Sequence, residues 1–306
     1  MPQHFLTMLE LSADELRAVL TRSHEFKRLR GTAVHPRPLA GRSVAVIMEK
    51  ASTRTRISFE IGIHELGGQP VALAGRDLQL GRDEPLGDTA RVLSRYVQAV
   101  VIRTFGHERI EQLAAASSVP VINALTDLHH PCQILADLMT IQQHRAHGLD
   151  DLCVAWVGDG NNVAHSWIFA AARLGIELRL ACPSGHAPDE AVLAQAAGAG
   201  PGRITVTTDV AQAVRGAHVV TTDVWASMGQ EDEAEARRKA FVGYCVTDQV
   251  MALAAPEPIF LHCLPAHRGE EVSAEVIDGP ASRVWDQAEN RLHAQKGLLE
   301  LVCGRG

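Results

Sequence analysis

Short apolar segments alternate with segments of helical periodicity along most of the chain of 306 residues. Residues 43–48, for instance, form a mainly apolar run, and the spacing over 55–66 predicts a helix that stops at Gly67-Gly68. Apolar runs without alternation are typical of strands buried on both faces, and therefore of parallel sheets covered by helices. The pattern predicts an α/β protein.

The alternation forms two series, and the length of about two average domains favours the same division. The predicted strands are 43–48, 71–74, 99–103 and 119–125 in the first series, and 152–158, 177–182, 204–207, 218–223 and 259–264 in the second. We place the boundary in the polar stretch 143–151. We expect two doubly wound parallel-sheet domains joined by helices, at 1–147 and 148–285, with the C-terminal helix 286–306 packing back on the first.

Composition and charge exclude several classes of protein. The 29 basic and 36 acidic residues leave a net charge of −7, which argues against a general nucleic-acid binder. No apolar run approaches the roughly 20 residues that cross a bilayer, and the first residues lack the pattern of a signal peptide. The six cysteines show no CxxC spacing, which disfavours zinc clusters and disulfide frameworks. We therefore expect a cytoplasmic protein without a membrane or nucleic-acid partner.

Unusual polar residues follow the predicted strands at the ends where open parallel sheets bind ligands. They are residues 52–56, Arg103, His130, residues 161–162, Asp223 and residues 262–263. A single residue of this kind is weak support for a function, but the repeated placement favours an enzyme.

The first of these clusters, Ser52-Thr53-Arg54-Thr55-Arg56, joins a strand to a helix. Free N–H groups and the dipole at a helix start favour an anion, and an arginine fork can grip phosphate oxygens. The alternative is an ordinary cap with two solvated arginines. Capping explains Ser52 or Thr53 but not five successive residues without an apolar side chain, so we favour an anion site. It is not a Walker A loop, because that spacing is absent.

His130-Pro131-Cys132-Gln133 opens another predicted helix, with Pro131 suited to its first turn. Taken alone, His130 is best interpreted as a capping or space-filling side chain. Beside a phosphate site, His130 can donate to a carbonyl oxygen, and the amide of Gln133 can bond an adjacent NH₂ group.

Gly158-Asp159-Gly160-Asn161-Asn162 lies between a predicted strand and a helix. Gly-x-Gly suggests a dinucleotide site, but Val163 replaces the third glycine and the next strand lacks the acid that would hold a ribose. A tight turn with asparagines capping the helix is an equally good interpretation. If a ligand binds there, two adjacent amides suit a zwitterion.

Two further segments are ambiguous by themselves. Residues 223–231 join an acid, a hydroxyl and glycine in what could be a solvated loop, and Cys263, which follows His262, could be a structural thiol. If Asp223 and Cys263 lie on neighbouring strand ends, the pair could orient an amine and relay its proton.

Together, four motifs resemble a known family. Ser-Thr-Arg-Thr-Arg at 52–56 and His-Pro-Cys-Gln at 130–133 resemble carbamoyltransferases in general. Asp-x-x-x-Ser-Met-Gly at 223–229 and His-Cys-Leu-Pro at 262–265, with Asn162, resemble the ornithine branch of the aspartate/ornithine carbamoyltransferase family. The resemblance spans essentially the whole chain. It implies transfer of the carbamoyl group of carbamoyl phosphate to the side-chain amine of L-ornithine, giving L-citrulline and phosphate, in arginine biosynthesis.

The resemblance also implies roles for the residues at matching positions. Carbamoyl phosphate would contact Ser52, Thr53, Arg54, Thr55, Gln79, Arg103, His130 and Gln133, and ornithine would contact Asn162, Asp223, Ser227, Met228, Cys263 and Leu264. The catalytic residues would be Arg103, His130, Asp223 and Cys263, and Arg291 would complete the site. Without the resemblance, Gln79 and Arg291 would be interpreted as solvated surface residues.

Related enzymes are homotrimers whose two α/β domains close around the substrates. This implies an active site in the cleft between the domains, and a homotrimer or a multiple of trimers. The chemistry requires neither a metal nor a cofactor. It does require a neutral amine, whose pKa would be near the 10.4 of lysine in water, and the Asp223–Cys263 pair is the candidate for handling its proton.

Other functions remain as alternatives. Within the family, the acceptor could be aspartate, putrescine or an acylated ornithine, although a cationic substrate matches Asp223 better than aspartate does. A nicotinamide-dependent dehydrogenase and a non-catalytic protein that binds carbamoyl phosphate are the alternatives from other classes.

Overall fold

The computed structural model describes residues 4–75, 84–226 and 233–304. The chain divides into two compact units, here called unit 1 (Met1–Met139 with Glu289–Gly306) and unit 2 (Thr140–Ala288). Both divisions fall inside helices, α5 (Pro131–His144) and α12 (Val284–Cys303). Each unit is a parallel sheet flanked by helices, so the expected α/β class with two parallel sheets is confirmed.

Unit 1 is built on a four-stranded sheet of order β2-β1-β3-β4, in which every neighbouring pair is parallel. Its strands are β1 (Ser43–Met48), β2 (Gln69–Ala74), β3 (Ala99–Arg103) and β4 (Val121–Leu125). The central strand β3 is buried along its whole length, as its uninterrupted apolar run predicts. β2 is an edge strand and is more exposed.

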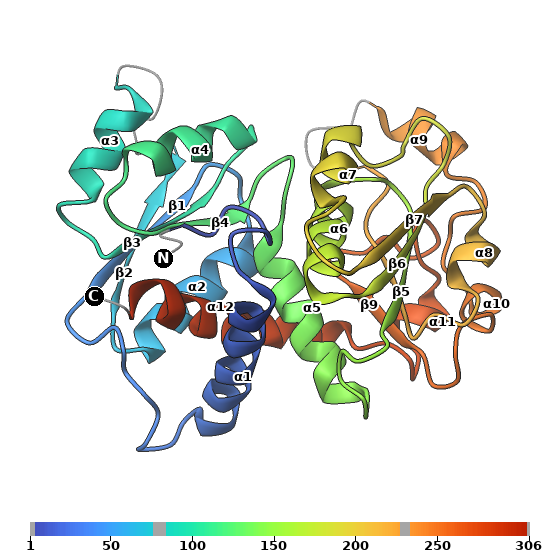
Figure 1. Cartoon of the computed structure of the whole chain (residues 1–306), viewed down its shortest axis with the longest axis horizontal. Helices are drawn as coiled ribbons and strands as arrows, with labels where there is room; N and C mark the ends of the chain where they lie inside the picture. The colour runs from blue at the N-terminus through green and yellow to red at the C-terminus, as the bar shows by residue number, and fades with distance from the viewer. Residues whose placement is uncertain (1–3, 76–83, 227–232, 305–306) are drawn as a thin grey trace. The chain divides into compact units, whose positions relative to one another are not determined.

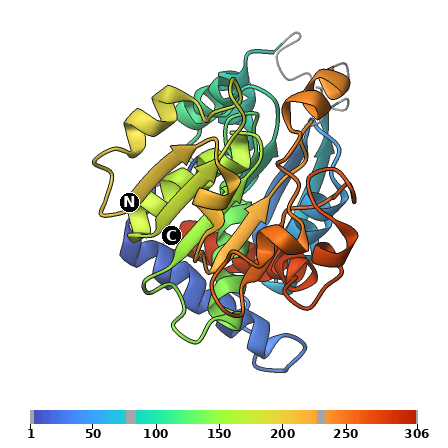
Figure 2. The ribbon, with the colours of Figure 1, turned by 90° about the vertical axis from the view of Figure 1, so that its right-hand side faces the viewer.

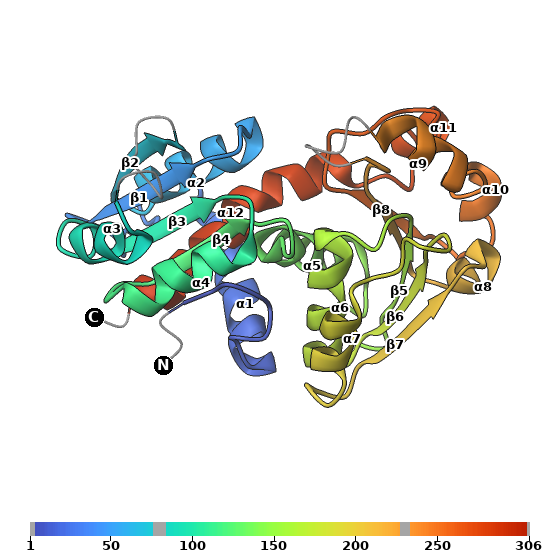
Figure 3. The ribbon, with the colours of Figure 1, turned by 90° about the horizontal axis from the view of Figure 1, so that it is seen from above.

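Helices cover both faces of this sheet. They are α1 (Ala13–Leu29), α2 (Thr53–Glu65), α3 (Leu86–Leu93), α4 (His107–Ala116), the first part of α5 and the second part of α12. In Figure 1, α3 and α4 lie above the strands of unit 1 and α2 and α12 lie below them. Figure 3 looks onto the side that carries α3 and α4. Leu113 of α4 packs with Val100 and Ile102 of β3 in one apolar core.

Unit 2 contains a five-stranded parallel sheet of order β7-β6-β5-β8-β9. Its strands are β5 (Cys153–Val157), β6 (Glu177–Ala181), β7 (Arg203–Thr207), β8 (Val219–Thr222) and β9 (Ile259–His262). Its helices are α6 (Asn162–Leu174), α7 (Glu190–Ala196), α8 (Val210–Val214), α9 (Ala234–Ala240), α10 (Asp248–Met251) and α11 (Ala274–Ile277). Figure 1 shows α6 and α7 on one face and α8 and α10 on the other, and Figure 2 shows the strands side by side.

The strand order reverses once in each sheet. In unit 1 the chain runs from β1 outward to β2 and then continues on the other side of β1 with β3. In unit 2 it runs from β5 outward to β7 and continues on the other side of β5 with β8. Ligands of open parallel sheets bind at such a switch point, outside the carboxyl ends of the strands. The fold therefore assigns one candidate binding position to each unit.

Several element boundaries differ from the sequence prediction by one or two residues; β2, for example, begins at Gln69 rather than at 71, and α2 begins at Thr53 rather than at 55. β4 begins at Val121 rather than at 119, because Pro120 has no N–H to donate to a ladder. α3 begins at Leu86, directly after Pro85, whose fixed φ suits the residue that precedes a helix. Among the described residues, none of the helices combines the length and the apolarity needed to cross a bilayer.

A buried ion pair joins α2 and α12 within unit 1. Lys296 has a fully buried side chain, and its Nζ donates to Glu65 Oε2 at 2.6 Å, whereas Glu65 is 20% exposed. Burial lowers the pKa of Lys296, and the bond to Glu65 opposes that shift. The buried ammonium group therefore depends on this carboxylate.

We expect Glu65→Ala to lower the free energy of unfolding by about 3 kcal/mol, because removing one partner of a buried pair leaves the other charge uncompensated. Glu60→Ala in the same helix is the control. It removes a pair with Arg56, whose side chain is 59% exposed, and should lower stability by less than about 1 kcal/mol. Urea unfolding measures both, and equal losses would show that the Lys296–Glu65 pair has no special importance.

Candidate active site

The first cluster lies where β1 ends and α2 begins, at the switch point of unit 1. Ser52 is the N-cap of α2, and its hydroxyl accepts from the backbone N–H of Thr55 at 3.3 Å and donates to Thr55 Oγ1 at 3.0 Å. The capping interpretation is therefore correct for Ser52. The helix start also borders a cavity of about 440 Å³, lined in part by Met48, Ser52, Thr53 and Gly75. A helix N-terminus that opens onto a cavity is suited to an anion.

The two arginines of this cluster differ. Arg56 lies on the exposed side of α2, where its Nε donates to Glu60 at 2.7 Å. The charge of Arg54, by contrast, acts on the buried His130. Of the two arginines, Arg54 is therefore the one whose charge acts on another predicted site residue of unit 1.

His130 lies at the start of α5 and is 5% exposed. Burial lowers its pKa well below 6.5, and the positive charges of Arg291, Arg103 and Arg54 lower it further. His130 is therefore a neutral imidazole at physiological pH. A neutral ring can donate one hydrogen bond to a carbonyl oxygen without placing a further positive charge among three arginines.

Arg291, interpreted as a surface residue unless the family resemblance is used, is 3% exposed. It lies on α12, and its Nη1 donates to Gln133 Oε1 at 2.6 Å while its Nη2 is 3.5 Å from Thr55 Oγ1. The amide of Gln133 also donates to Asp137 at 2.8 Å. Arg291 thus connects the start of α2 to the start of α5 and orients the Gln133 side chain.

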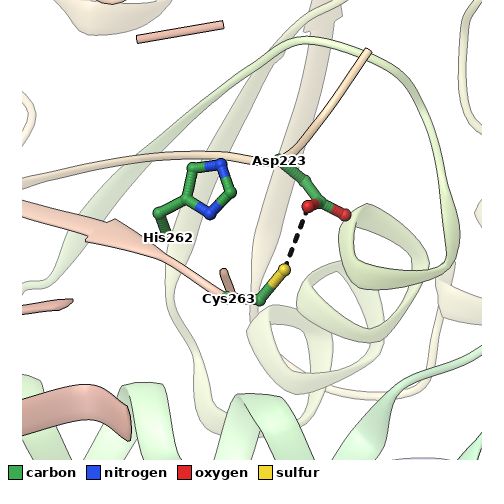
Figure 4. A group of neighbouring side chains, drawn as sticks. All are labelled: Asp223, His262 and Cys263. Atoms are coloured by element: carbon green, nitrogen blue, oxygen red, sulfur yellow. Dashed lines mark hydrogen bonds between the residues drawn. The ribbon is translucent and has the colours of Figure 1, made fainter. Parts of the chain in front are cut away.

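The second cluster surrounds Asp223, which follows β8 at the switch point of unit 2 and is 7% exposed. The Sγ of Cys263 donates to Asp223 Oδ1 at 3.0 Å, as Figure 4 shows. The same oxygen accepts from the N–H of Val224 at 2.8 Å, and Oδ2 accepts from Asn161 Nδ2 at 2.8 Å. β8 and β9 are neighbours, so the condition stated for the Asp223–Cys263 pair is fulfilled.

The two asparagines that follow β5 have different positions. Asn161 is the N-cap of α6, and its Oδ1 accepts from the N–H groups of Val163 and Ala164. Asn162 is the first residue of the helix. The capping interpretation is correct for Asn161, which in addition holds Asp223. The bond between Asn161 and Asp223 was not predicted from the sequence. Its only signal there was the placement of two asparagines directly after a predicted strand.

The end of β9 is held by hydrogen bonds of His262, whose side chain is fully buried. Its Nδ1 accepts from the N–H of Leu264 at 2.8 Å, and its Nε2 lies 3.2 Å from Glu271 Oε1. Leu264 has a φ of +60°, in the left-handed region. The turn after β9 therefore presents Cys263 and Leu264 with a backbone conformation that local hydrogen bonds maintain.

Among the described residues, two groups place possible metal ligands within 4.8 Å of one another: Asp223, His262 and Cys263, and also His267, Glu270 and Glu271. In the first group both ring nitrogens of His262 face hydrogen-bond partners. In the second, Glu270 forms an ion pair with Arg238 at 2.9 Å. Metal binding would have to break these interactions. Three predicted site residues, Gln79, Ser227 and Met228, lie outside the described residues.

An ion pair that the sequence did not reveal supports the loop after β5. Arg237 on α9 is 9% exposed and donates to Asp159 Oδ2 and to the carbonyl oxygen of Trp225, both at 3.0 Å. It thereby links the Gly158-Asp159-Gly160 turn to the segment that follows Asp223. Burial raises the pKa of Asp159, and Arg237 opposes that shift. In the sequence, the only sign of this ion pair is that Asp159 lies between two glycines.

Comparisons with known proteins identify related domains in both parts of the chain. A family model described as the carbamoyl-phosphate-binding domain of aspartate/ornithine carbamoyltransferase matches residues 3–143, and one described as the Asp/Orn-binding domain matches residues 150–302. The ornithine carbamoyltransferase of Pelobacter propionicus is 53% identical over 304 residues, which are 99% of each chain. That of Acidothermus cellulolyticus is 54% identical over 314 residues, covering 100% of this chain and 99% of the relative.

The similarity extends to three-dimensional structure. A solved structure of ornithine carbamoyltransferase from Pyrococcus furiosus superposes with a TM-score of 0.94 at 47% identity, covering 100% of this chain and 98% of that one. The structure of the Burkholderia thailandensis enzyme gives a TM-score of 0.90 at 45% identity, covering 99% of this chain and 100% of that one. The resemblance indicated by the four motifs is therefore confirmed, and the chain belongs to the aspartate/ornithine carbamoyltransferase family.

Proposed function

We propose that this protein transfers the carbamoyl group of carbamoyl phosphate to the side-chain amine of L-ornithine, giving L-citrulline and phosphate. The observation that carries the proposal is the contact of Cys263 with Asp223 in unit 2, in a chain whose unit 1 gathers Arg54, Arg103 and Arg291 around His130. The first group suits a cationic amine and the second suits a phosphorylated carbonyl compound.

Residues 1–147, with the C-terminal helix 286–306, would bind carbamoyl phosphate. The α2 start would hold the phosphate, with Ser52, Thr53, Arg54, Thr55 and Gln79 as its partners. The carbonyl oxygen would accept from Arg103, Thr55 and neutral His130. Three fixed donors at this oxygen would stabilise the negative charge that develops during attack, an effect of typically ~10²–10³ in rate per donor.

In this proposal the carbamoyl NH₂ group faces Gln133, whose side chain the Arg291 bond holds in one orientation. An amide oxygen is the natural acceptor for an NH₂ group. The interaction distinguishes a carbamoyl group from an acetyl group, which offers no N–H. Arg291 would therefore act on the substrate through Gln133 and Thr55.

Residues 148–285 would bind ornithine. Asn162, Ser227 and Met228 would hold its amino-acid end, and Leu264 and Cys263 would face its side-chain amine. Asp223 supplies the negative charge that attracts this ammonium group, whose pKa in water is near 10.4 and which is therefore almost fully protonated at pH 7. The Asp223–Cys263 pair would take the proton that must leave before attack.

Transfer of the carbamoyl group forms one bond and breaks another. The neutral nitrogen attacks the carbonyl carbon and a C–N bond forms. The bond between the carbonyl carbon and the bridging oxygen of the phosphate breaks, and its electron pair remains on the phosphate. The second proton of the nitrogen ends on the departing phosphate. Arg54 and the α2 start stabilise that leaving group, because both favour negative charge.

A panel of acceptors tests the substrate. With carbamoyl phosphate, the protein should form a ureido product from ornithine at a rate at least about 100-fold above the rates with aspartate, putrescine or N-acetylornithine, a difference of about 2.7 kcal/mol in transition-state binding. Colorimetric detection of the ureido group measures all four acceptors in parallel. A higher rate with any other acceptor would contradict ornithine as the substrate.

We further propose a homo-oligomer, a trimer or a multiple of trimers, as the family resemblance implies. Ile57 and Ile61 lie one turn apart on α2 and are 49% and 39% exposed, and Val71 on the neighbouring edge strand β2 is 38% exposed. These apolar side chains suit a second copy of the chain. Light scattering should give about 99 kDa, three chains of 33.0 kDa, or a multiple of it. A mass of 33 kDa would contradict the proposal.

The same reaction suggests a cellular role in arginine biosynthesis in the cytoplasm. A bacterial host that lacks this activity and requires arginine or citrulline should grow without either when it expresses the protein in its cytoplasm. Expression of Asp223→Asn in the same host is the control and should not restore growth. Failure of the unaltered protein to restore growth would contradict this role.

A further inference from the structure

We propose that Glu271 is a positioning residue for the ornithine side of the reaction, acting through His262 on the turn that carries Cys263 and Leu264. This inference rests on the proposed function, since it assigns a role in the same site. Glu271 lies nine residues after His262 and was not among the predicted site residues.

Glu271 holds both ends of the turn with one oxygen. Its Oε1 accepts from the backbone N–H of His267 at 2.6 Å and lies 3.2 Å from Nε2 of His262. The side chains of Glu271 and His262 are both fully buried. The carboxylate therefore fixes the distance between the ring of His262 and the backbone of His267. It also fixes the orientation of the imidazole ring.

The hydrogen bonds of His262 determine its tautomer. Nδ1 accepts from the N–H of Leu264 at 2.8 Å, so it carries a lone pair. The ring proton is then on Nε2, where the carboxylate of Glu271 accepts it. By accepting a hydrogen bond from Nε2, the Glu271 carboxylate stabilises the tautomer whose Nδ1 can accept from the Leu264 N–H. Carboxylates that bond to metal-binding histidines orient those rings in the same way.

The turn needs this support because of its backbone. Leu264 has a φ of +60°, a conformation that is unfavourable for a residue with a Cβ. Such conformations persist where the surroundings enforce them. The His262–Leu264 bond enforces this one, and the adjacent Cys263 is thereby placed with its Sγ 3.0 Å from Asp223 Oδ1.

Stability alone does not account for Glu271. Burying a carboxylate is unfavourable, and well-packed apolar residues commonly replace buried charges without loss of stability. Among the described residues, Oε2 of Glu271 has no hydrogen-bond partner, and it lies 3.8 Å from Nδ1 of the exposed His267. One oxygen of this buried acid therefore makes no hydrogen bond, and we attribute the presence of the acid to its other oxygen, which orients His262.

Four variants test the proposal in the full-length protein. Glu271→Leu removes both acceptors at similar volume, Glu271→Asp withdraws the carboxylate by one methylene, and Glu271→Gln keeps an acceptor oxygen at the same reach. Glu270→Leu is the matched control, because Glu270 is the neighbouring, partly exposed acid paired with Arg238. The Asp variant keeps the test available if the Leu variant does not fold.

We expect the Leu and Asp variants to raise KM for ornithine at least tenfold and to lower kcat by a similar factor, while the Kd for inorganic phosphate changes less than twofold. The Gln variant should stay within about threefold of the unaltered protein, and Glu270→Leu should be unchanged. Unchanged KM and kcat in the Asp variant, or equal losses in the Gln and Leu variants, would overturn the proposal.

A second measurement does not depend on the reaction. The rate at which iodoacetamide alkylates Cys263, followed by peptide mass spectrometry, should change at least threefold in the Leu and Asp variants but not in the Gln variant or the Glu270→Leu control. If no citrulline forms with any protein yet this pattern appears, the proposed function fails and the positioning role stands. An alkylation rate that is the same in all variants would overturn the positioning role.

Discussion

Arg103→Gln should lower kcat for citrulline formation by about 10²–10³-fold, because it removes a charged donor from the oxygen that becomes negative during attack. Arg103 is the last residue of β3 and is 5% exposed, so its charge acts with little screening by water. It is also one of the three arginines that keep the nearby His130 neutral. Steady-state kinetics at saturating ornithine measures the loss.

Two controls accompany this variant. Arg95→Gln removes an equally charged but exposed residue of unit 1 and should leave kcat within twofold. Arg103→Lys keeps the charge without the planar fork and should recover part of the loss. A kcat for Arg103→Gln within tenfold of the unaltered protein would show that Arg103 does not stabilise the transition state.

Asp223→Asn should lower turnover by about 10²–10⁴-fold, the usual contribution of a positioned acid or base. The substitution keeps the shape of the side chain, but it removes the charge that attracts the ammonium group and one of the two acceptor oxygens that hold Cys263, Val224 and Asn161. The Kd for inorganic phosphate should change less than twofold, because the anion residues lie on unit 1.

Cys263→Ala separates the thiol from the carboxylate in this pair. It should reduce turnover at neutral pH more than it weakens carbamoyl phosphate binding. Asp150→Asn, at an exposed position of unit 2, is the control for Asp223→Asn, because it also removes a carboxylate. It should change neither turnover nor carbamoyl phosphate binding. Full turnover by Cys263→Ala at pH 7 would exclude a role for the thiol in handling the amine's proton.

The strands were predictable because their signal is strong and local. Uninterrupted apolar runs such as that of β3 are typical of a parallel sheet, and the polar residue that ends each run then lies at one edge of that sheet. The contact of Cys263 with Asp223 required that they end neighbouring strands, a condition that the apolar runs left open and that the order β5-β8-β9 fulfils.

Arg291 and Glu271 could not be found in this way. Both are buried polar residues, whereas periodicity assigns polar positions to solvent. Helix α12 has only moderate amphipathic character because its inward positions include Gln287, Arg291 and Lys296, which are satisfied by partners from distant segments. Such partners depend on tertiary contacts. Only the family resemblance singled out Arg291, and nothing in the sequence singled out Glu271.

Formation of the new bond is the most direct test of the central claim. The protein is incubated with ¹³C-carbamoyl phosphate and ornithine labelled with ¹⁵N at its side-chain amine, and the products are analysed by NMR. We predict a ureido carbon with one-bond ¹³C–¹⁵N coupling, formed in a 1:1 ratio with inorganic phosphate. Phosphate release with the ¹³C in carbonate or cyanate, and without any coupled carbon, would contradict the account.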